Sequence, residues 1–598
     1  MVAIIALGVR GRRTAANLAV LAPLASLVGV ALAGASQFKT SPPYTGSYEW
    51  LNVATAFSGP ARFQTYITDI GIRVTHLTTL LMACALVISL AVLAWSRAGA
   101  RGEPSPARYY GLLTLLLACT LGVIVSTDLS EIYVFWGVAA IASWLLLSNA
   151  WADPASTLAA RLSLAVPAIS DLSLLAGIAV LYSRYGQLAI DQLIPGMTQL
   201  GPQPKSLGVA AILILVGAVG RLGLFPFQGW LTGAGPASGG ALAAVQGFWT
   251  LIVAGLLYKV MPIIVSADLL THWIPGKSLA ATAAVSAVLL PLLGLASLDV
   301  RKAVIASGIG VSAIAVLAFT RPGDVAAAAV LLAVTGLART AATLATGSLV
   351  AGMRTSLINE MGEGWRRMRL SVAALPLAAA ALVAGVGVVA GGTLRWYWVL
   401  AYALGLGLAS LGFLRVYLLT AYPYLPRRRG FDPNRVRPAA ESMSYPPLVL
   451  GLLALGLSVA FYWPSFLGWT DNRPHPAGDP TLFAYWLAVP VGGALLATVL
   501  FSVSRSSGAR LTTTAAAGWE RVAFRGRLVL DRLLVEPALT LAERTEDDVV
   551  PGAEDNLRQL VEESAQLVRR PLAVIPILVG VAVLLAVIAG LVAPAVYR

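Results

Sequence analysis

Three ionisable residues lie in segments that are otherwise almost entirely apolar. Asp171 occupies the middle of RLSLAVPAISDLSLLAGIAVLY, Arg221 lies within ILILVGAVGRLGLFPFQGWL, and Arg339 lies within VLLAVTGLARTAATLATGSL. Charged side chains at membrane depth are rare and costly, and they often mark ion or proton pathways. We therefore treat Asp171, Arg221 and Arg339 as candidates for a proton or charge relay.

The same residue types also fit a structural role. A carboxylate and a guanidinium on neighbouring helices form a neutral pair, and Asp171 with Arg221 would then lock two helices together. A relay residue must release and rebind its proton, whereas arginine stays protonated in proteins. Arg221 and Arg339 can thus act as fixed charges that tune Asp171 or hold water, but they cannot carry protons by titrating.

Pro226 follows Arg221 by about one and a half helical turns. Proline has no N–H to donate, and its ring clashes with the preceding turn, so it interrupts a helix. Broken helices beside buried charge mark transport sites in many membrane proteins. We therefore expect a helix break at Pro226.

The rest of the chain has the composition of a membrane protein. Of its 598 residues, 58% are hydrophobic and 12% are charged, against about 25% charged in soluble domains. This excludes a soluble enzyme, and we expect an all-α polytopic membrane protein with about 15–16 spans. The predicted spans begin near Thr14, Thr75, Tyr109, Asp128, Ala160, Leu207, Ala237, Ser278, Lys302, Val325, Leu370, Trp396, Pro446, Leu482 and Leu572.

The net charge of +14 follows from membrane orientation. If the first full helix begins inside, most Lys and Arg residues fall in inner segments, which is the usual asymmetry of membrane proteins. Examples are Arg97, Arg101, Arg354, Arg366 and Arg427. The charge therefore needs no nucleic-acid partner, and we expect a multi-pass protein of the bacterial inner membrane.

The sequence contains no recognisable motif for a redox cofactor or a metal site. Cys84 and Cys119 lie in apolar runs, and His76, His272 and His475 are scattered, so we expect neither a disulfide framework nor a metal site. The chain has no GxGxxG motif after a strand and no cysteine cluster. We expect no cofactor in this chain.

The chain ends differ from the central spans. Residues 1–9 are apolar but too short to span, and they fit either the tail of a further helix or an interfacial start. Charged and apolar residues alternate at helical spacing in residues 515–570, which indicates amphipathic helices along the membrane or neighbouring subunits. A small helical hairpin on the inner side is the alternative.

These patterns suggest five regions. Residues 1–73 hold the helix stub, the first full span and an outer loop, in which residues 42–50 form a cap. Residues 74–420 hold the core helices, and residues 421–503 hold further spans. Residues 504–571 form the lateral segment on the cytoplasmic side, and residues 572–598 form the last span.

Four segments resemble the antiporter-like membrane subunits of respiratory complex I, and specifically the subunit L (subunit 5) type. They are GAVGRLGLFPFQGW at 217–230, SLDVRKAVIAS at 297–307, GLARTAATLATGSLVAGM at 336–353 and EIYVFWGVAAIASWLLL at 131–147. The resemblance covers the entire chain. It implies broken helices and a lateral helix, here 515–570, that straps antiporter-like neighbours.

The departures from the family pattern fall on its proton machinery. The resemblance places the family's essential Glu at Gly137, its two Lys residues at Arg221 and Arg339, and a His at Thr335, whereas its Asp is kept as Asp171. The segment VVAGGTLRW also lacks the Lys and Asp that the family has there. These substitutions imply an impaired proton channel, with pumping through other groups and water as the alternative.

The resemblance leaves the following functions open. The chain is expected to be a subunit-L-type component of a redox-driven NADH-quinone oxidoreductase-like complex that contributes to proton translocation or to its coupling. The alternatives are a membrane subunit of a cation/proton antiporter, of a membrane-bound hydrogenase-type complex, or of an inorganic-carbon uptake transporter. A paralogue that only scaffolds a complex is the third possibility.

Overall fold

The computed structural model describes most of the chain up to residue 460. The described ranges are 12–39, 43–55, 64–99, 105–150, 152–185, 188–193, 205–266, 274–320, 325–389, 396–421, 441–460, 466, 469–470 and 491–492. All of them belong to the first of two units into which the chain divides, residues 1–516. Residues 1–9, the lateral segment 515–570 and the last predicted span lie outside the described residues, as does most of the span predicted from Leu482.

The predicted all-α membrane fold is confirmed. Within the described ranges, eleven helices are long and apolar enough to cross a membrane, and Leu207–Leu222 and Arg369–Leu382 are shorter apolar helices. Each corresponds to one of the first thirteen predicted spans. The long helices are α2 (Arg12–Lys39), α3 (His76–Gly99), α4 (Pro106–Val125), α5 (Leu129–Leu147), α6 (Pro154–Tyr185), α8 (Lys205–Leu222), α10 (Gly239–Ser266), α11 (Ile274–Ala296), α12 (Val300–Ala318), α13 (Val325–Met353), α15 (Arg369–Val389), α16 (Trp396–Ala421) and α17 (Glu441–Ala460).

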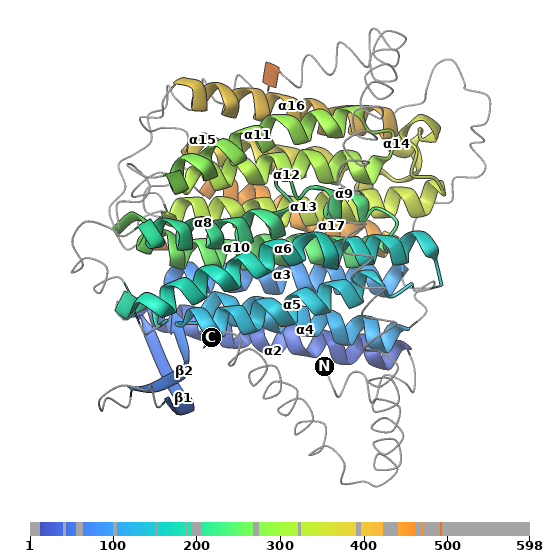
Figure 1. Ribbon diagram of the computed structural model, residues 1–598. Helices are drawn as coiled ribbons and strands as arrows, with labels where there is room; N and C mark the ends of the chain where they lie inside the picture. The colour runs from blue at the N-terminus through green and yellow to red at the C-terminus, as the bar shows by residue number, and fades with distance from the viewer. Residues whose placement is uncertain are drawn as a thin grey trace, which may run out of the picture. The chain divides into compact units, whose positions relative to one another are not determined.

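Three short helices complete the described helical elements. They are α9 (Gly229–Gly233), the 3₁₀ helix η2 (Ile358–Glu360) and α14 (Gly364–Arg367). The long helices run side by side, so that segments far apart in the sequence become neighbours (Figure 1). The membrane requires every backbone group to be satisfied within the protein, which explains why these apolar runs are helical.

A β-hairpin replaces part of the loop expected after the first span. Strand β1 (Tyr44–Thr55) pairs antiparallel with β2 (Gln64–Val74), in a register from Tyr44↔Val74 to Thr55↔Gln64. The hairpin lies near one end of the helices and extends away from the bundle, below α2 in the view of Figure 1. The prediction of a loop at residues 42–50 was wrong, because tyrosine, threonine and valine occur in both strands and favour extended backbone.

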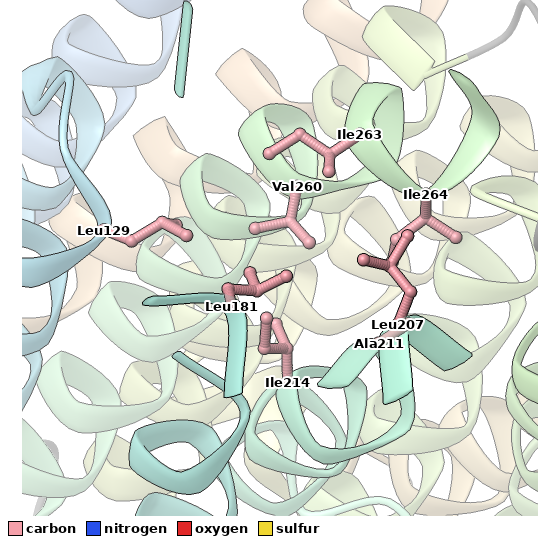
Figure 2. A pocket seen from close by; sticks show the side chains of 8 residues that line it. All are labelled: Leu129, Leu181, Leu207, Ala211, Ile214, Val260, Ile263 and Ile264. Carbon is pink, nitrogen blue, oxygen red and sulfur yellow. The ribbon is translucent and has the colours of Figure 1, made fainter. Parts of the chain in front are cut away.

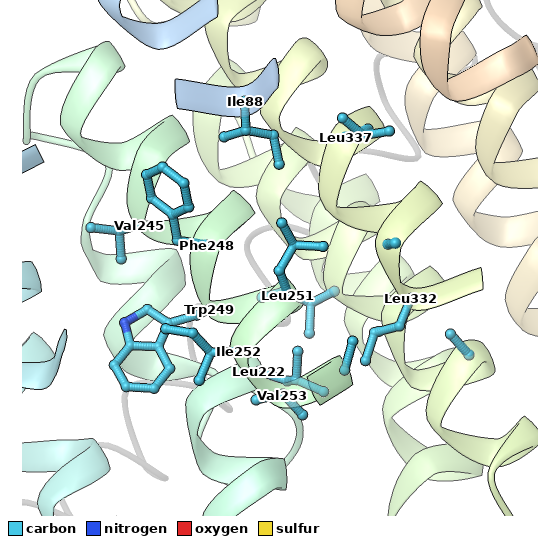
Figure 3. Packing of buried hydrophobic residues seen from close by; sticks show 14 of the residues in the cluster. Ile88, Leu222, Val245, Phe248, Trp249, Leu251, Ile252, Val253, Leu332 and Leu337 are labelled. Carbon is cyan, nitrogen blue, oxygen red and sulfur yellow. The ribbon is translucent and has the colours of Figure 1, made fainter. Parts of the chain in front are cut away.

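Helix α10 forms the centre of the described bundle. The most apolar 18-residue stretch of its span Gly239–Ile264 is wholly buried, and the helix packs against α3, α4, α5, α8 and α13. Figure 3 shows its side chains Val245, Phe248 and Leu251 among residues from neighbouring helices. Because α10 touches helices on several sides, polar residues on its different faces reach separate parts of the core.

Candidate functional site

The site begins with a buried ion pair between α6 and α8. Arg221 donates from Nε to Asp171 Oδ1 at 2.8 Å and from a terminal nitrogen to Asp171 Oδ2. The Arg221 side chain is 0% exposed and that of Asp171 is 17% exposed. This two-pronged geometry is the strong form of an Arg–carboxylate interaction. The structure therefore joins two of the three relay candidates into one neutral unit.

Small residues bring these two helices close enough for the pair to form. A Cβ atom added at Gly177 would lie 2.9 Å from the carbonyl oxygen of Ala210, and one added at Gly217 would lie 2.8 Å from the Cβ of Leu174. Close helix approach through small residues is a common way of packing in membranes. The glycines therefore set the distance across which Asp171 meets Arg221.

Gly220 is the tightest of these positions, because a side chain there would overlap that of Ser170. We expect Gly220→Leu to push α6 away from α8 and to lower stability by about 1–3 kcal/mol, as overpacking usually does. The thermal denaturation midpoint of the purified complex measures this. The matched control is Gly456→Leu, an exposed helical glycine with no atom within 4 Å of its added Cβ. Equal midpoints for the two variants would contradict the packing argument.

Two tryptophans surround the ion pair. Trp136 on α5 donates from Nε1 to Asp171 Oδ1 at 2.7 Å, and the Cζ of Arg221 lies 4.3 Å from the ring centroid of Trp249 on α10. The two rings meet edge to face with centroids 4.9 Å apart. Trp249 donates in turn to Ser143 Oγ at 2.9 Å. The pair is thereby held by four helices, and the aromatic face adds cation–π stabilisation.

The expected break at Pro226 is present just after Arg221. Helix α8 ends at Leu222, the residue whose carbonyl a helical Pro226 would contact. Gly223 follows with φ of +72°, a conformation that glycine adopts at little cost. Trp230 spans the break by donating from Nε1 to the carbonyl oxygen of Gly220 at 2.9 Å. The break thus places Arg221 in the last turn of a helix with a braced end.

Arg339 lies in a separate polar pocket of the core and is 2% exposed. One terminal nitrogen donates to Thr250 Oγ1 at 3.2 Å and to Ser312 Oγ at 3.1 Å, and the other donates to Gln246 Oε1 at 3.4 Å. No carboxylate pairs with it among the described residues. Neutral oxygens therefore solvate this guanidinium, which remains a fixed positive charge.

Helix α10 connects the two arginines. Trp249 lies under Arg221, and the next residue, Thr250, accepts from Arg339. The sequence alone did not identify Trp136, Trp249 or Thr250 as parts of the site. The available signal was the indole N–H, because a buried tryptophan in a membrane needs a hydrogen-bond acceptor.

The two substituted family positions have different surroundings. A Cβ added at Gly137 would meet no atom within 4 Å, so a larger side chain fits there. Thr335 is buried, and its hydroxyl donates to the carbonyl oxygen of Leu332 at 2.7 Å within α13. Neither residue supplies an ionisable group to the site.

A small aliphatic cavity lies beyond the ion pair, toward the predicted outer side. Helices α5, α6, α8 and α10 line it with Leu129, Leu181, Leu207, Ala211, Ile214, Val260, Ile263 and Ile264 (Figure 2). Along α6, Leu181 is about 15 Å from Asp171, and along α8, Ile214 is about 10 Å from Arg221. The cavity lining is therefore entirely aliphatic.

Two further ionisable residues were not recognised from the sequence. Glu131 on α5 and Lys259 on α10 contact adjacent residues of the turn between α4 and α5, because Lys259 donates to the carbonyl oxygen of Ser126 and Glu131 accepts from Thr127 N. Both are near the ends of their spans, where charged residues are common, so the sequence gave no reason to single them out. Elsewhere in the described part of the chain, no group of three His, Cys, Asp or Glu residues could hold a metal ion.

Residues 126–414 match the protein family described as NADH:quinone oxidoreductase/Mrp antiporter, TM. The matched range begins at the turn between α4 and α5 and ends within α16. It contains Asp171, Arg221 and Arg339. The resemblance expected from the sequence motifs is thereby confirmed.

The chain is also similar in sequence to curated proteins, at identities of 25–27%. NADH-quinone oxidoreductase subunit L of Mycobacterium tuberculosis is 25% identical over 508 residues, which cover 78% of this chain and 77% of the relative. The chloroplast NAD(P)H-quinone oxidoreductase subunit 5 of Adiantum capillus-veneris is 27% identical over 252 residues, 40% of this chain. The alignments with this protein and with its counterpart from Mesostigma viride span only 33% and 39% of those relatives' own length.

Two solved structures share the fold. One is the membrane-bound sulfane sulfur reductase, an archaeal respiratory membrane complex, with a TM-score of 0.62, 18% identity and coverage of 82% of this chain and 96% of that chain. The other is the Mrp complex of Dietzia sp., with a TM-score of 0.60, 18% identity and coverage of 79% and 95%. The chain is a homologue of the NADH-quinone oxidoreductase subunit L/5 proteins and carries the NADH:quinone oxidoreductase/Mrp antiporter transmembrane domain over residues 126–414.

Proposed function

We propose that this chain is the subunit-L-type membrane subunit of a redox-driven NADH-quinone oxidoreductase-like complex. It contributes to proton translocation or to its coupling, but protons do not pass by titration of its central residues. The supporting observation is the buried pair in which both Asp171 oxygens accept from Arg221. Arg221 cannot release its proton, and both Asp171 oxygens accept from it, so the pair acts as fixed charge.

Two further features support an impaired central route, by which we mean proton transfer through Asp171, Arg221 and Arg339. Gly137 has no side chain where the family resemblance implies a glutamate, and Arg339 stays charged where it implies a lysine. The aliphatic cavity, which lies between α5, α6, α8 and α10, has a lining without polar side chains. Proton transfer needs a chain of donors and acceptors, which this lining does not supply.

The proposal extends to the chain's surroundings. Its partners would be other membrane subunits, as in the complexes to which its relatives' names refer, with residues 504–571 contacting antiporter-like neighbours and residues 572–598 forming the last span. The membrane would be the bacterial inner membrane. The chain itself would hold no redox cofactor, and the partner subunits would supply the electron transfer.

Redox-driven proton movement into proteoliposomes containing the purified complex tests this function. We expect Asp171→Asn to leave the number of protons moved per electron unchanged, because the carboxylate does not carry them. The amide keeps an acceptor for Trp136 and Arg221. If this single variant fails to assemble, Asp171→Asn with Arg221→Gln removes both charges and still tests whether Asp171 carries protons.

Each outcome has a clear meaning. Loss of proton movement in an intact Asp171→Asn complex would show that Asp171 carries protons and would overturn the fixed-charge proposal. Cation/proton exchange by the wild-type complex without any redox reaction would instead identify an antiporter subunit, the function of the Mrp-type alternative.

A further inference from the structure

A second polar cluster lies at the predicted outer ends of α4, α5 and α10. The Nζ of Lys259 donates to the carbonyl oxygens of Val123 and Ser126 at 2.5 and 2.6 Å. Glu131 is 8% exposed, and its Oε2 accepts from the backbone N–H groups of Gly71 and Thr127, each at 3.4 Å. The two side chains therefore contact adjacent residues, Ser126 and Thr127, of the turn between α4 and α5.

This cluster differs from the central site in its chemistry. Glutamate and lysine can each gain or lose a proton, whereas Arg221 and Arg339 stay charged. Both members of the Glu131–Lys259 pair can therefore change charge, unlike the Asp171–Arg221 pair. Titratable groups at membrane depth are functional candidates by default.

The cluster has charged neighbours that extend to the surface. Arg73 on β2 lies near Lys259 and forms an ion pair with Asp191, and their side chains are 40% and 64% exposed. Asp128, which caps α5, lies on the turn between α4 and α5, and its side chain accepts from Ser130 N at 2.7 Å. These groups provide a polar connection from Lys259 and Glu131 to the solvent on that side.

The aliphatic cavity borders this cluster without joining it. Leu129 and Val260, which line the cavity, are near neighbours in sequence of Glu131 and Lys259 (Figure 2). The Lys259 ammonium contacts the α4 carbonyls, not the cavity. The cluster is therefore polar beside α4, whereas the neighbouring cavity is lined by aliphatic side chains.

Helix α10 also connects the cluster to the centre. Lys259 lies about 13 Å along this helix from Thr250, which accepts from Arg339. Trp249, whose ring lies against Arg221, is the residue before Thr250. A change of charge at Lys259 therefore acts on the helix that contacts both buried arginines, within a medium where charges are poorly screened.

We propose that Glu131 and Lys259 form a proton-binding site that exchanges with the predicted outer side and couples its proton concentration to the buried arginines through α10. This rests on the proposed function and identifies where the coupling takes place. A purely structural role, in which Lys259 only caps the carboxyl end of α4, is the competing explanation, since cations stabilise helix carboxyl ends.

Lys259→Arg separates these roles, because arginine can still donate to Val123 and Ser126 but cannot release its proton. We would vary the outer pH of oriented proteoliposomes at fixed inner pH and measure redox turnover of the whole complex. For wild type we expect a one-proton dependence, at most about tenfold per pH unit. In Lys259→Arg and in Glu131→Gln, this dependence should disappear. Glu360→Gln, which removes an exposed carboxylate outside the cluster, is the control, and its profile should match wild type.

A second readout needs no turnover. An infrared difference spectrum after a jump in outer pH should contain a carboxyl protonation band that Glu131→Gln removes and Glu360→Gln keeps. Wild-type pH profiles in both cluster variants, with the band unchanged in Glu131→Gln, would overturn the proton-binding site. The proposed function would survive this result, since it fails only if the complex moves no protons with electron transfer or if Asp171→Asn abolishes that movement.

Discussion

Replacing Asp171 by alanine is expected to destabilise the protein by about 3–5 kcal/mol, the usual cost of removing one partner of a buried ion pair. Arg221 is 0% exposed and would keep only the Trp249 ring beside its guanidinium, with its Asp171 acceptors gone. The yield of assembled complex and its thermal denaturation midpoint measure the effect. Both should fall sharply.

The double variant Asp171→Ala with Arg221→Leu tests the cause. With both charges removed, no unpaired guanidinium remains, and apolar replacements of buried pairs are often tolerated. We expect most of the lost stability to return. Asp191→Ala is the control, since it removes the exposed partner of Arg73 and should cost no more than about 1 kcal/mol. A double variant as unstable as Asp171→Ala would show that the ion pair is not the source of the loss.

Restoring titratable residues to the central route should have the largest functional effect. Gly137→Glu combined with Arg221→Lys supplies the carboxylate and the amine that the family resemblance implies. The structure accommodates both, because a side chain at Gly137 meets no atom within 4 Å at its Cβ and lysine is smaller than the arginine it replaces. We expect voltage-driven proton flux through the complex to rise about tenfold, which corresponds to about 1.4 kcal/mol off the barrier.

Flux in liposomes without a redox substrate measures this gain, and Arg221→Lys alone is the matched control. The single variant lacks the carboxylate that Gly137→Glu introduces, so we expect its flux to stay near wild type. No increase in an intact double variant would mean that the aliphatic cavity, and not the missing titratable groups, limits the route. Ile214→Ser, which places a hydroxyl in the cavity lining, would then be the next variant to measure.

The transmembrane helices were predictable, whereas the polar contacts between them were not. Runs of about 20 apolar residues are a composition signal, and the first thirteen predicted spans appear in the structure. The Asp171–Arg221 pairing followed from charge alone as one of two interpretations. The break at Pro226 followed from proline chemistry.

The remaining features depend on three-dimensional proximity. Nothing in the spacing of Trp136, Trp249 and Ser143 shows that α5 and α10 bring them to one ion pair. Glu131 and Lys259 lie 128 positions apart in the numbering, and each resembles an ordinary residue at a span end. The β-hairpin was missed because its strands follow a proline-containing stretch that indicates a loop.

The adjacency of Trp249 and Thr250 on α10 has a mechanical consequence. Consecutive helical residues project about 100° apart, so the two side chains face different neighbours from one rigid element. Any turning of α10 about its axis would shift the indole under Arg221 and the hydroxyl beside Arg339 at the same moment. The positions of the two guanidinium groups are therefore coupled through α10, although the groups do not contact each other.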